Sequence, residues 1–341
     1  MAPRTRRVRT VFIGTGPFGV ESLRRLAERP SANLVEVVGV VAAPARPAGR
    51  QGWIETSPIE RAAGELAIPS ILTPVRLRDP AAIEAVLGLR PALVVLADYG
   101  RIVPRPILDL PLAALNLHPS LLPRHRGATP IPATILAGDR ETGVTMIRMD
   151  AGIDTGPIVA AARVSLSGSE TAPELEARLA MAAADLLERT LGPWIAGTIE
   201  PAEQDAGAAT LTRLLRREDG RLDPGRSAAE LERQVRAYQP WPGAFLETGA
   251  LRIVVLEARP TTLGVGAPTS SRPVGTLSRA GDGLALTTAD GALELLEVQP
   301  AGGRPMSGAE LLRGRPDLAE STVVRSRPGA DDRGPLERPV R

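Results

Sequence analysis

Asn116 and His118 are the residues whose types and spacing first suggest chemistry. They lie two positions apart in the stretch LNLHPSLLPRHRG at 115–127. If LNL continues an extended strand, their side chains project from the same face, and Pro119 favours an extended conformation at His118. An amide donor and an imidazole would then point together beyond the carboxyl end of a strand, where open α/β sheets bind ligands.

Asp154 adds a carboxylate from a second unusual stretch, MDAGIDTGPIVA at 149–160. Gly152 and Gly156 flank it and permit a close approach of the backbone. Asn, His and Asp together suit acyl-type transfer, with donors for an oxyanion and a carboxylate that orients the histidine or steers a proton. No serine in a GxSxG motif accompanies them, which favours direct attack by the substrate over a covalent acyl enzyme.

Each of these three residues also has an ordinary structural interpretation. A lone asparagine can cap a turn, a lone histidine can be a satisfied core residue, and an aspartate in a glycine-rich loop can form an Asx turn. Residue types and spacing alone leave both interpretations open.

The elements that position these residues follow an alternating pattern. Near-continuous apolar runs of strand length are separated by helical patterns, which predicts a doubly wound, mostly parallel sheet of the α/β class. The expected strands are 8–14, 34–43 and 92–97, and the expected helices are 17–28, 58–66, 79–88 and 171–191. Thr171 and Glu174 have capping-box spacing at the start of the last helix.

The glycines at 14, 16 and 19 have the GxGxxG spacing of a dinucleotide-binding turn. Such a site also needs an acidic residue at the end of the second strand, and that strand ends VVAAP. The pattern therefore favours a tight strand-to-helix turn, in which Gly14 and Gly16 have positive φ or close contacts. A non-catalytic nucleotide-binding module is the rival interpretation.

Composition limits the class of protein. The chain has 341 residues, of which 43% are hydrophobic, enough for two domains with packed cores. It has no cysteine and two histidines, so we expect no disulfides and no metal site. All 41 basic residues are arginines, and the net charge is only +2. We expect a cytoplasmic protein, because a chain without cysteine fits a reducing compartment and the first ten residues do not resemble a signal peptide.

The pattern changes after about residue 205. Ser227 and Glu230 predict one further short helix, and short strands then alternate with turns, as in a small antiparallel barrel or sandwich. We expect one domain over 1–205 and a second, all-β domain over 206–315. Residues 316–341 contain few apolar side chains, so we expect a disordered tail.

The stretch NLHPSLLPRHRGATPIPATILAGDRETGVTMIRMDAGIDTGPIV resembles the core of the formyltetrahydrofolate-dependent formyltransferases. The resemblance also includes GTGPFG, ARPAGR, RAYQPWPGAF and LLEVQPAGGRPMSGAELLRG, in order over about residues 8–315. It implies a Rossmann-like formyltransferase core followed by a small OB-like domain. The last two blocks lie outside the core, and they favour the branch of the family that acts on tRNA.

In that branch, the resemblance implies transfer of a formyl group from 10-formyltetrahydrofolate to the α-amino group of methionine on initiator tRNA. Asn116 and His118 would hydrogen-bond the formyl oxygen, and Asp154 would hold His118 and help to move the amine proton. Folate would be a consumed co-substrate, with no metal. The implied folate contacts are Ser120, Leu121, Leu122, Pro123, Tyr99 and Gly100.

The resemblance also implies that Arg46 and Arg50 meet the acceptor end of tRNA. This chain departs from the family pattern just after them, at 51–53, and also at His125, where an aromatic residue is common, and at Asp98, where a small residue is common. A rival within the family is transfer to a sugar-nucleotide amine. We expect a monomer that has no membrane partner.

Overall fold

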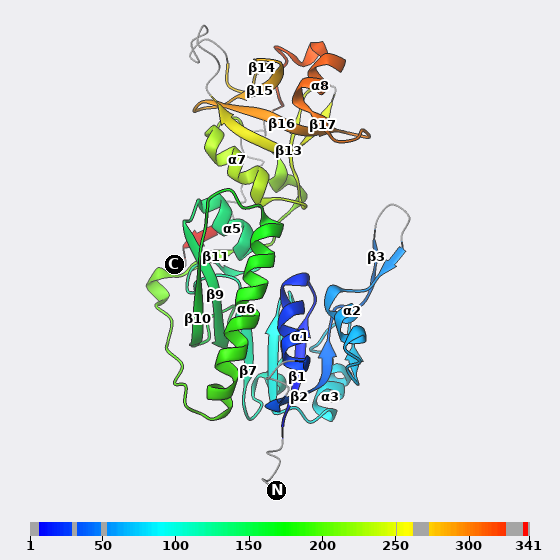
Figure 1. Cartoon of the computed structure of the whole chain (residues 1–341), viewed down its shortest axis with the longest axis vertical. Helices are drawn as coiled ribbons and strands as arrows, with labels where there is room; N and C mark the ends of the chain where they lie inside the picture. Colours follow the sequence, from blue (N-terminus) through cyan, green and yellow to red (C-terminus); the bar gives the residue numbers. More distant parts are fainter. Residues whose placement is uncertain are drawn as a thin grey trace.

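The computed structural model describes residues 7–28, 33–48, 53–249, 251–261, 273–324 and 337–339. The amino-terminal part holds a seven-stranded sheet flanked by helices, and the carboxyl-terminal part is a separate layer of antiparallel strands (Figure 1). The predicted fold class, a doubly wound and mostly parallel α/β domain followed by a small all-β domain, is confirmed.

The large sheet has the strand order β10-β9-β7-β6-β1-β2-β5. Its strands are β1 (Val8–Gly14), β2 (Val35–Val41), β5 (Ile71–Leu72), β6 (Leu93–Ala97), β7 (Ala114–His118), β9 (Glu141–Arg148) and β10 (Ile158–Ser165). All neighbours from β5 to β7 pair in parallel, whereas β9 is antiparallel to both β7 and β10. The carboxyl ends of β1, β6 and β7 therefore meet at one edge.

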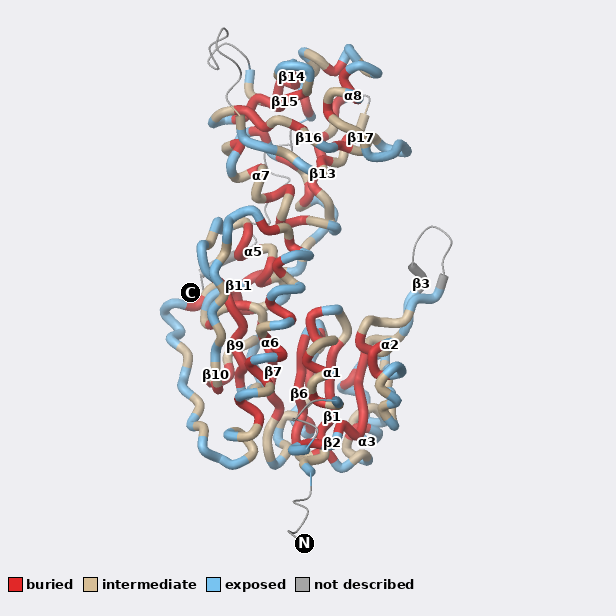
Figure 2. The backbone as a smooth tube through the Cα atoms, viewed as in Figure 1, coloured by how far each residue is buried: buried red, intermediate tan, exposed pale blue. Residues whose placement is uncertain are grey.

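Helices cover both faces of this sheet, and each face has its own apolar core. The larger core includes side chains of α1 (Val20–Glu28), α2 (Pro58–Glu65), α5 (Pro130–Ala137) and α6 (Ala172–Ile195). The smaller includes α3 (Pro80–Gly88) and α4 (Arg105–Leu108). In Figure 2 the parallel strands β1, β2, β6 and β7 are buried along most of their length. Both faces of the parallel strands are thus covered, which explains their continuous apolar sequences.

Helix α6 begins where its capping box predicts. Glu174 accepts hydrogen bonds from the backbone N–H and the hydroxyl of Thr171, both at 2.9 Å. A helix cap of this kind stabilises a helix by about 1 kcal/mol. The helix continues to Ile195, beyond the predicted end at 191.

The carboxyl-terminal sheet encloses a third apolar core. Ser227 caps α7 (Ala228–Ala237) by accepting from the Glu230 backbone, as predicted. The sheet is formed by β12 (Ala244–Glu247), β13 (Arg252–Thr261), β14 (Leu277–Ala280), β15 (Gly283–Thr287) and β16 (Ala292–Pro300). The short strand β17 (Met306–Ser307) pairs with β16 and leads into α8 (Gly308–Gly314).

The segment that joins the two sheets lies against the first of them. Strand β11 (Thr210–Thr212) pairs in parallel with β8 (Arg126–Gly127), which follows β7 in the chain. The domain boundary at 205 stays a prediction, and residues just beyond it are part of the amino-terminal body in space.

The expectation of a disordered tail over 316–341 is wrong for residues 316–324. Leu318 and Val323 are 1% and 3% exposed and belong to the core of the second sheet. Val323 also forms a bridge with Thr248. Two apolar side chains and a few backbone hydrogen bonds are enough to hold this segment. Strand β18 (Glu337–Pro339) pairs with β11, and the residues at 325–336 and 340–341 lie outside the described part.

The glycine-rich turn after β1 is closed by the protein itself. An ideal Cβ at Gly14 would lie 2.7 Å from the Ala97 carbonyl oxygen, and one at Gly16 would lie 1.7 Å from Asp98 Oδ2. Gly16 has a φ of −83°, so close contacts and not a positive φ require glycine there. The Gly16 N–H donates to the Asp98 carboxylate, which occupies the place of an external anion.

Candidate active site

The carboxyl ends of β6 and β7 open onto a cavity of about 890 Å³. The parallel register pairs Leu96 with Asn116 and Ala97 with Leu117, so both strands end at the same edge. Asn116 and His118 line the cavity and are 6% and 4% exposed. The structure therefore brings this amide and this imidazole to one partly open cavity at the end of β7.

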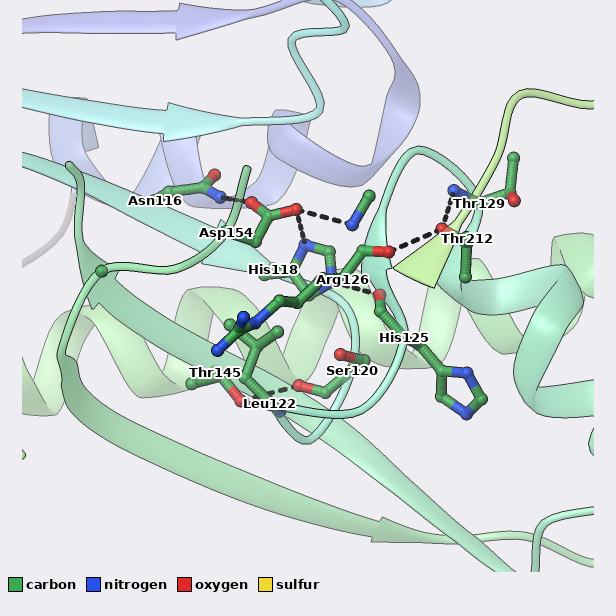
Figure 3. Close-up of polar contacts among 12 residues, drawn as sticks. Asn116, His118, Ser120, Leu122, His125, Arg126, Thr129, Thr145, Asp154 and Thr212 are labelled. Carbon is green, nitrogen blue, oxygen red and sulfur yellow. Dashed lines mark hydrogen bonds and ion pairs between the residues drawn. The ribbon is translucent and has the colours of Figure 1, made fainter. Parts of the chain in front are cut away.

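Asp154 places its carboxylate beside both of them (Figure 3). Asn116 Nδ2 donates to Asp154 Oδ1 at 3.2 Å, and His118 Nδ1 lies 3.6 Å from Asp154 Oδ2. Oδ2 also accepts a hydrogen bond from the Gly127 backbone N–H at 2.8 Å. Three side chains from two separate stretches of sequence thus meet in one cavity, and their chemical roles stay predictions.

The loop that carries Asp154 is tightly folded. Asp154 itself has a φ of +52°, in the left-handed region that aspartate tolerates better than most residues. An ideal Cβ at Gly156 would lie 1.9 Å from the Arg148 carbonyl oxygen, so only glycine fits there without a shift. The side chain of Asp150 accepts from the Gly152 N–H at 2.9 Å and braces the turn. The close backbone approach expected at both glycines is present.

The two ring nitrogens of His118 have different partners. Nε2 lies 2.9 Å from the carbonyl oxygen of His125, and because a carbonyl only accepts, Nε2 must carry a hydrogen. The 3.6 Å between Nδ1 and Asp154 Oδ2 is too long for a hydrogen bond. Nδ1 can therefore accept a proton in the neutral ring and donate one in the imidazolium.

His125 aims that carbonyl group through an unusual backbone conformation. The φ of His125 is +58°, and the residue is 2% exposed. The ring Nε2 lies 2.9 Å from Asp139 Oδ2, and the backbone N–H donates to Thr210 Oγ1 at 2.8 Å. Contacts on both sides thus hold His125 in a conformation that is uncommon for this residue type.

The residues expected to contact folate fall into two groups. Tyr99 and Gly100 line the cavity, whereas none of the four residues at 120–123 is among its lining residues. Their contact with folate stays a prediction that this arrangement does not favour. Residues that do line the cavity, and that sequence reasoning did not assign to folate, include Ile102 and Ile153, which are 73% and 67% exposed.

The loop at 120–123 turns inward because its polar groups are satisfied within the protein. Ser120 Oγ donates to the Arg124 carbonyl at 2.7 Å. Thr145 Oγ1, on β9, donates to the Ser120 carbonyl at 2.7 Å and accepts from the Leu122 N–H at 3.0 Å. Ser120 is fully buried. This loop is therefore a packed support for the end of β7.

The further carboxyl groups that line the cavity include Asp98, after β6, and Glu176, in the second turn of α6. Burial, and then repulsion by Asp98, raises the pKa of Glu176 to about 7. Burial also raises the pKa of Asp98, which is open to the cavity but surrounded by protein, while the hydrogen bond from Gly16 opposes that rise. Nothing in the sequence around Glu176 marks it as a cavity residue.

Arg46 and Arg50, the residues expected to bind tRNA, belong to a different region. Arg46 begins β3 (Arg46–Ala48), which pairs with β4 (Trp53–Glu55), and Arg50 lies outside the described residues. Strand β3 stands out from the body of the amino-terminal domain in Figure 1. Arg46 is exposed and is not among the residues that line the cavity.

In the part of the chain that the structure describes, no group of three or more His, Cys, Asp or Glu side chains is arranged to hold a metal ion. No helix in the same residues is long and apolar enough to cross a membrane.

Sequence models of known families match both parts of the chain. The model described as "Formyl transferase" matches residues 7–191, and "Formyl transferase, C-terminal domain" matches residues 214–316. A curated relative, the methionyl-tRNA formyltransferase of Roseiflexus castenholzii, is 42% identical over 308 residues, which cover 90% of this chain and 96% of the relative.

Solved structures share the fold at lower identity. An N-formyltransferase from Helicobacter canadensis, in complex with folinic acid and dTDP-3-aminofucose, has a TM-score of 0.62 at 17% identity, over 84% of this chain and 98% of that one. HypX from Aquifex aeolicus with tetrahydrofolic acid has a TM-score of 0.59 at 18% identity, over 90% and 47%. Together, the family matches over both domains and the 42% identical relative show that this chain belongs to the formyl transferase family.

Proposed function

We propose that this chain transfers the formyl group of 10-formyltetrahydrofolate to the α-amino group of methionine on initiator methionyl-tRNA. The observation that carries the proposal is the meeting of Asn116, His118 and Asp154 in one cavity of a chain from the formyl transferase family. The acceptor is inferred from curated relatives named methionyl-tRNA formyltransferase, which are about 40% identical over 90% of this chain.

The proposed step is a direct attack by the amine. The amine nitrogen bonds to the formyl carbon, the formyl oxygen becomes an oxyanion, and the bond from that carbon to N10 of the folate then breaks. One proton leaves the attacking amine and one is taken up by N10. The absence of a GxSxG serine agrees with a single tetrahedral intermediate and no acyl enzyme.

Asn116 and His118 would stabilise the oxyanion. Asn116 Nδ2 is an amide donor already aimed into the cavity, and Asp154 is its present partner at 3.2 Å. Since Nε2 of His118 is bonded to a carbonyl, the only hydrogen that His118 can offer the substrate is on Nδ1 of the imidazolium. Preorganised donors of this kind act where the negative charge develops.

Asp154 would hold His118 and take up a proton from the attacking amine. Its Oδ2 lies 3.6 Å from His118 Nδ1, so the carboxylate faces the ring nitrogen that would donate to the oxyanion. The Gly127 N–H keeps Oδ2 in place. A proton that passes from the amine to the Asp154–His118 pair could then be released toward N10 of the folate.

Contacts with tRNA would come from outside the cavity. We propose that exposed Arg46, together with Arg50, meets the acceptor end, and that arginines of the carboxyl-terminal domain bind the phosphate backbone. Such contacts predict an affinity that falls as salt is raised. A monomeric, cytoplasmic enzyme stays our prediction, and gel filtration combined with light scattering tests the oligomeric state.

An acceptor comparison tests the proposal. The purified chain is incubated with 10-formyltetrahydrofolate and either charged initiator tRNA, charged elongator methionyl-tRNA or an amino-sugar nucleotide. We expect transfer to the initiator tRNA. Transfer only to the sugar would assign the chain to the other branch of the family, and transfer to none of them would contradict the proposal.

A further inference from the structure

Gln204 lies in a part of the chain that neither family model covers, between the matches that end at residue 191 and begin at residue 214. This connecting segment passes beside the catalytic cavity. Its backbone at Ala202 pairs with Ile158, and β11 pairs with β8. The connection is therefore part of the structure around the candidate site.

The amide group of Gln204 joins two loops of that site. Nε2 donates to the carbonyl oxygens of Asp154 at 2.8 Å and Gly156 at 2.7 Å. Oε1 accepts from Arg126 Nε at 3.1 Å and from Arg126 Nη2 at 2.8 Å. A primary amide has two donor hydrogens and two acceptor lone pairs, and all four are used.

Arg126 belongs to a run of three residues that each hold the candidate site. The carbonyl of His125 accepts from His118 Nε2 at 2.9 Å, and the N–H of Gly127 donates to Asp154 Oδ2 at 2.8 Å. Between them, Arg126 is 6% exposed, so its guanidinium has little access to water. Its planar guanidinium instead takes the Gln204 oxygen with two parallel N–H groups.

These contacts hold Asp154 from two sides. Its side chain is bonded to the Gly127 backbone, and its main chain is bonded through Gln204 to the adjacent Arg126. Asp154 has a left-handed φ of +52°, so its loop needs such support to stay in one conformation. The position of the carboxylate between Asn116 and His118 depends on both links.

We propose that Gln204 is a positioning residue for formyl transfer, which fixes the backbone of Asp154 against Arg126 and so sets the carboxylate between Asn116 and His118. This role rests on the proposed function for its effect on turnover. Gln204 does not touch the reacting atoms in this role, and the binding of either substrate does not depend on it.

Two substitutions separate the two halves of the Gln204 contact. Gln204→Glu keeps an acceptor for Arg126 but loses both donors to the carbonyls of Asp154 and Gly156. The new side chain therefore stays bonded to Arg126 and no longer holds the backbone of Asp154. Gln204→Met has similar size and loses all four hydrogen bonds. Glu203→Gln is the matched control, because Glu203 is the exposed neighbour in the same segment.

We expect both Gln204 variants to lower kcat by about 100-fold, the effect of a displacement near 1 Å at a reacting centre, while KM for either substrate changes less than threefold. Glu203→Gln stays within twofold of the unchanged chain. A rise in KM of the same magnitude, or full activity in Gln204→Glu, would overturn the proposal.

A double substitution tests whether Gln204 acts through Asp154. In an Asp154→Asn background, Gln204→Met should lower kcat by less than threefold further, because the group that it positions is already lost. A further 100-fold loss there would mean that Gln204 acts independently. Thermal unfolding of all variants is measured beside these rates, and a rate loss that follows the unfolded fraction would reduce Gln204 to a structural residue.

A substrate-free measurement distinguishes failure of this proposal from failure of the proposed function. The chain has two histidines, so the imidazole signals of His118 can be assigned in a nitrogen–proton NMR spectrum by comparison with His125→Gln. We expect these signals to shift at fixed pH in Gln204→Met and to stay unchanged in Glu203→Gln. Unchanged His118 signals in Gln204→Met contradict the positioning role, even if the unsubstituted chain formylates no tRNA.

Discussion

The turn after β1 and the end of β7 lie at the same edge of the large sheet, but their sequence motifs indicate different things. The turn after β1 carries the GxGxxG spacing, and it is filled by the Ala97 carbonyl and the Asp98 carboxylate. The end of β7 carries no such familiar glycine motif, but it leaves an amide and an imidazole facing a cavity of about 890 Å³. The glycine spacing of the turn after β1 thus indicates close packing. The polar side chains that meet at the end of β7 from distant segments indicate a candidate site for chemistry.

The largest expected effect is at the end of β7. Asn116→Ala removes a donor aimed at the position of the oxyanion, and His118→Ala removes the Nδ1 donor, so each should lower kcat by about 100- to 1,000-fold. Single-turnover formylation of charged initiator tRNA measures this loss.

Asn116→Asp is the matched control for that prediction. It keeps the size of the side chain but replaces the N–H donor with an acceptor, so it should be as slow as Asn116→Ala. An Asn116→Asp enzyme with nearly full activity would show that the N–H of Asn116 is not the group that matters.

An intermediate effect, on stability, is expected at the glycine turn. Gly14→Ala places a methyl group 2.7 Å from the Ala97 carbonyl oxygen, and we expect the free energy of unfolding to fall by about 1–3 kcal/mol. Urea unfolding measures it. The rate per folded molecule should change less than threefold, and NAD should not stabilise either form.

Gly64→Ala is the control for the turn. Gly64 lies within α2, and nothing is within 4 Å of its ideal Cβ, so alanine should raise the free energy of unfolding by up to about 1 kcal/mol. If Gly14→Ala were as well tolerated as Gly64→Ala, the close-packing explanation of the motif would be wrong.

The smallest effect is a pH dependence from Glu176, which lines the same cavity as Asn116 and His118. Its pKa is raised from 4.5 to about 7 by burial and by Asp98, so between these values the folded state binds more protons than the unfolded state. This contribution therefore lowers stability as pH rises from about 4.5 to 7, and it is constant above that.

Glu176→Gln should remove that pH dependence. We expect the variant to gain stability relative to the unchanged chain at pH 8 and to gain less at pH 5. Urea unfolding at both pH values measures the difference. An equal gain at the two values would mean that Glu176 does not titrate in this range.

Periodicity and strand length predicted much of the fold, because buried parallel strands and an amphipathic helix have distinct sequence patterns. Strand β1 has the predicted bounds, and α6 starts at its capping box. The strands β9 and β10 were not among the strands expected. Residues 316–324 were misjudged because only Leu318 and Val323 needed to be apolar for them to pack.

The candidate site was predictable where neighbours in sequence are neighbours in space. The spacing of Asn116 and His118 was sufficient to place them on one face, and the unusual loop marked Asp154. Two features were not predictable from local sequence. The loop at 120–123 faces Thr145, a partner 23 residues beyond Leu122, and Gln204 reaches Asp154 across 50 positions.

The three-stranded sheet of β8, β11 and β18 has a practical consequence for handling this protein. Strand β18 pairs with β11, whose other neighbour β8 holds Arg126, and Figure 1 places the end of the chain near β11. An affinity tag fused soon after residue 339 would begin close to the loops of the candidate site. Strand β1 begins at Val8, at the opposite end of the parallel strands, so purification handles, dyes and surface linkers belong on that side.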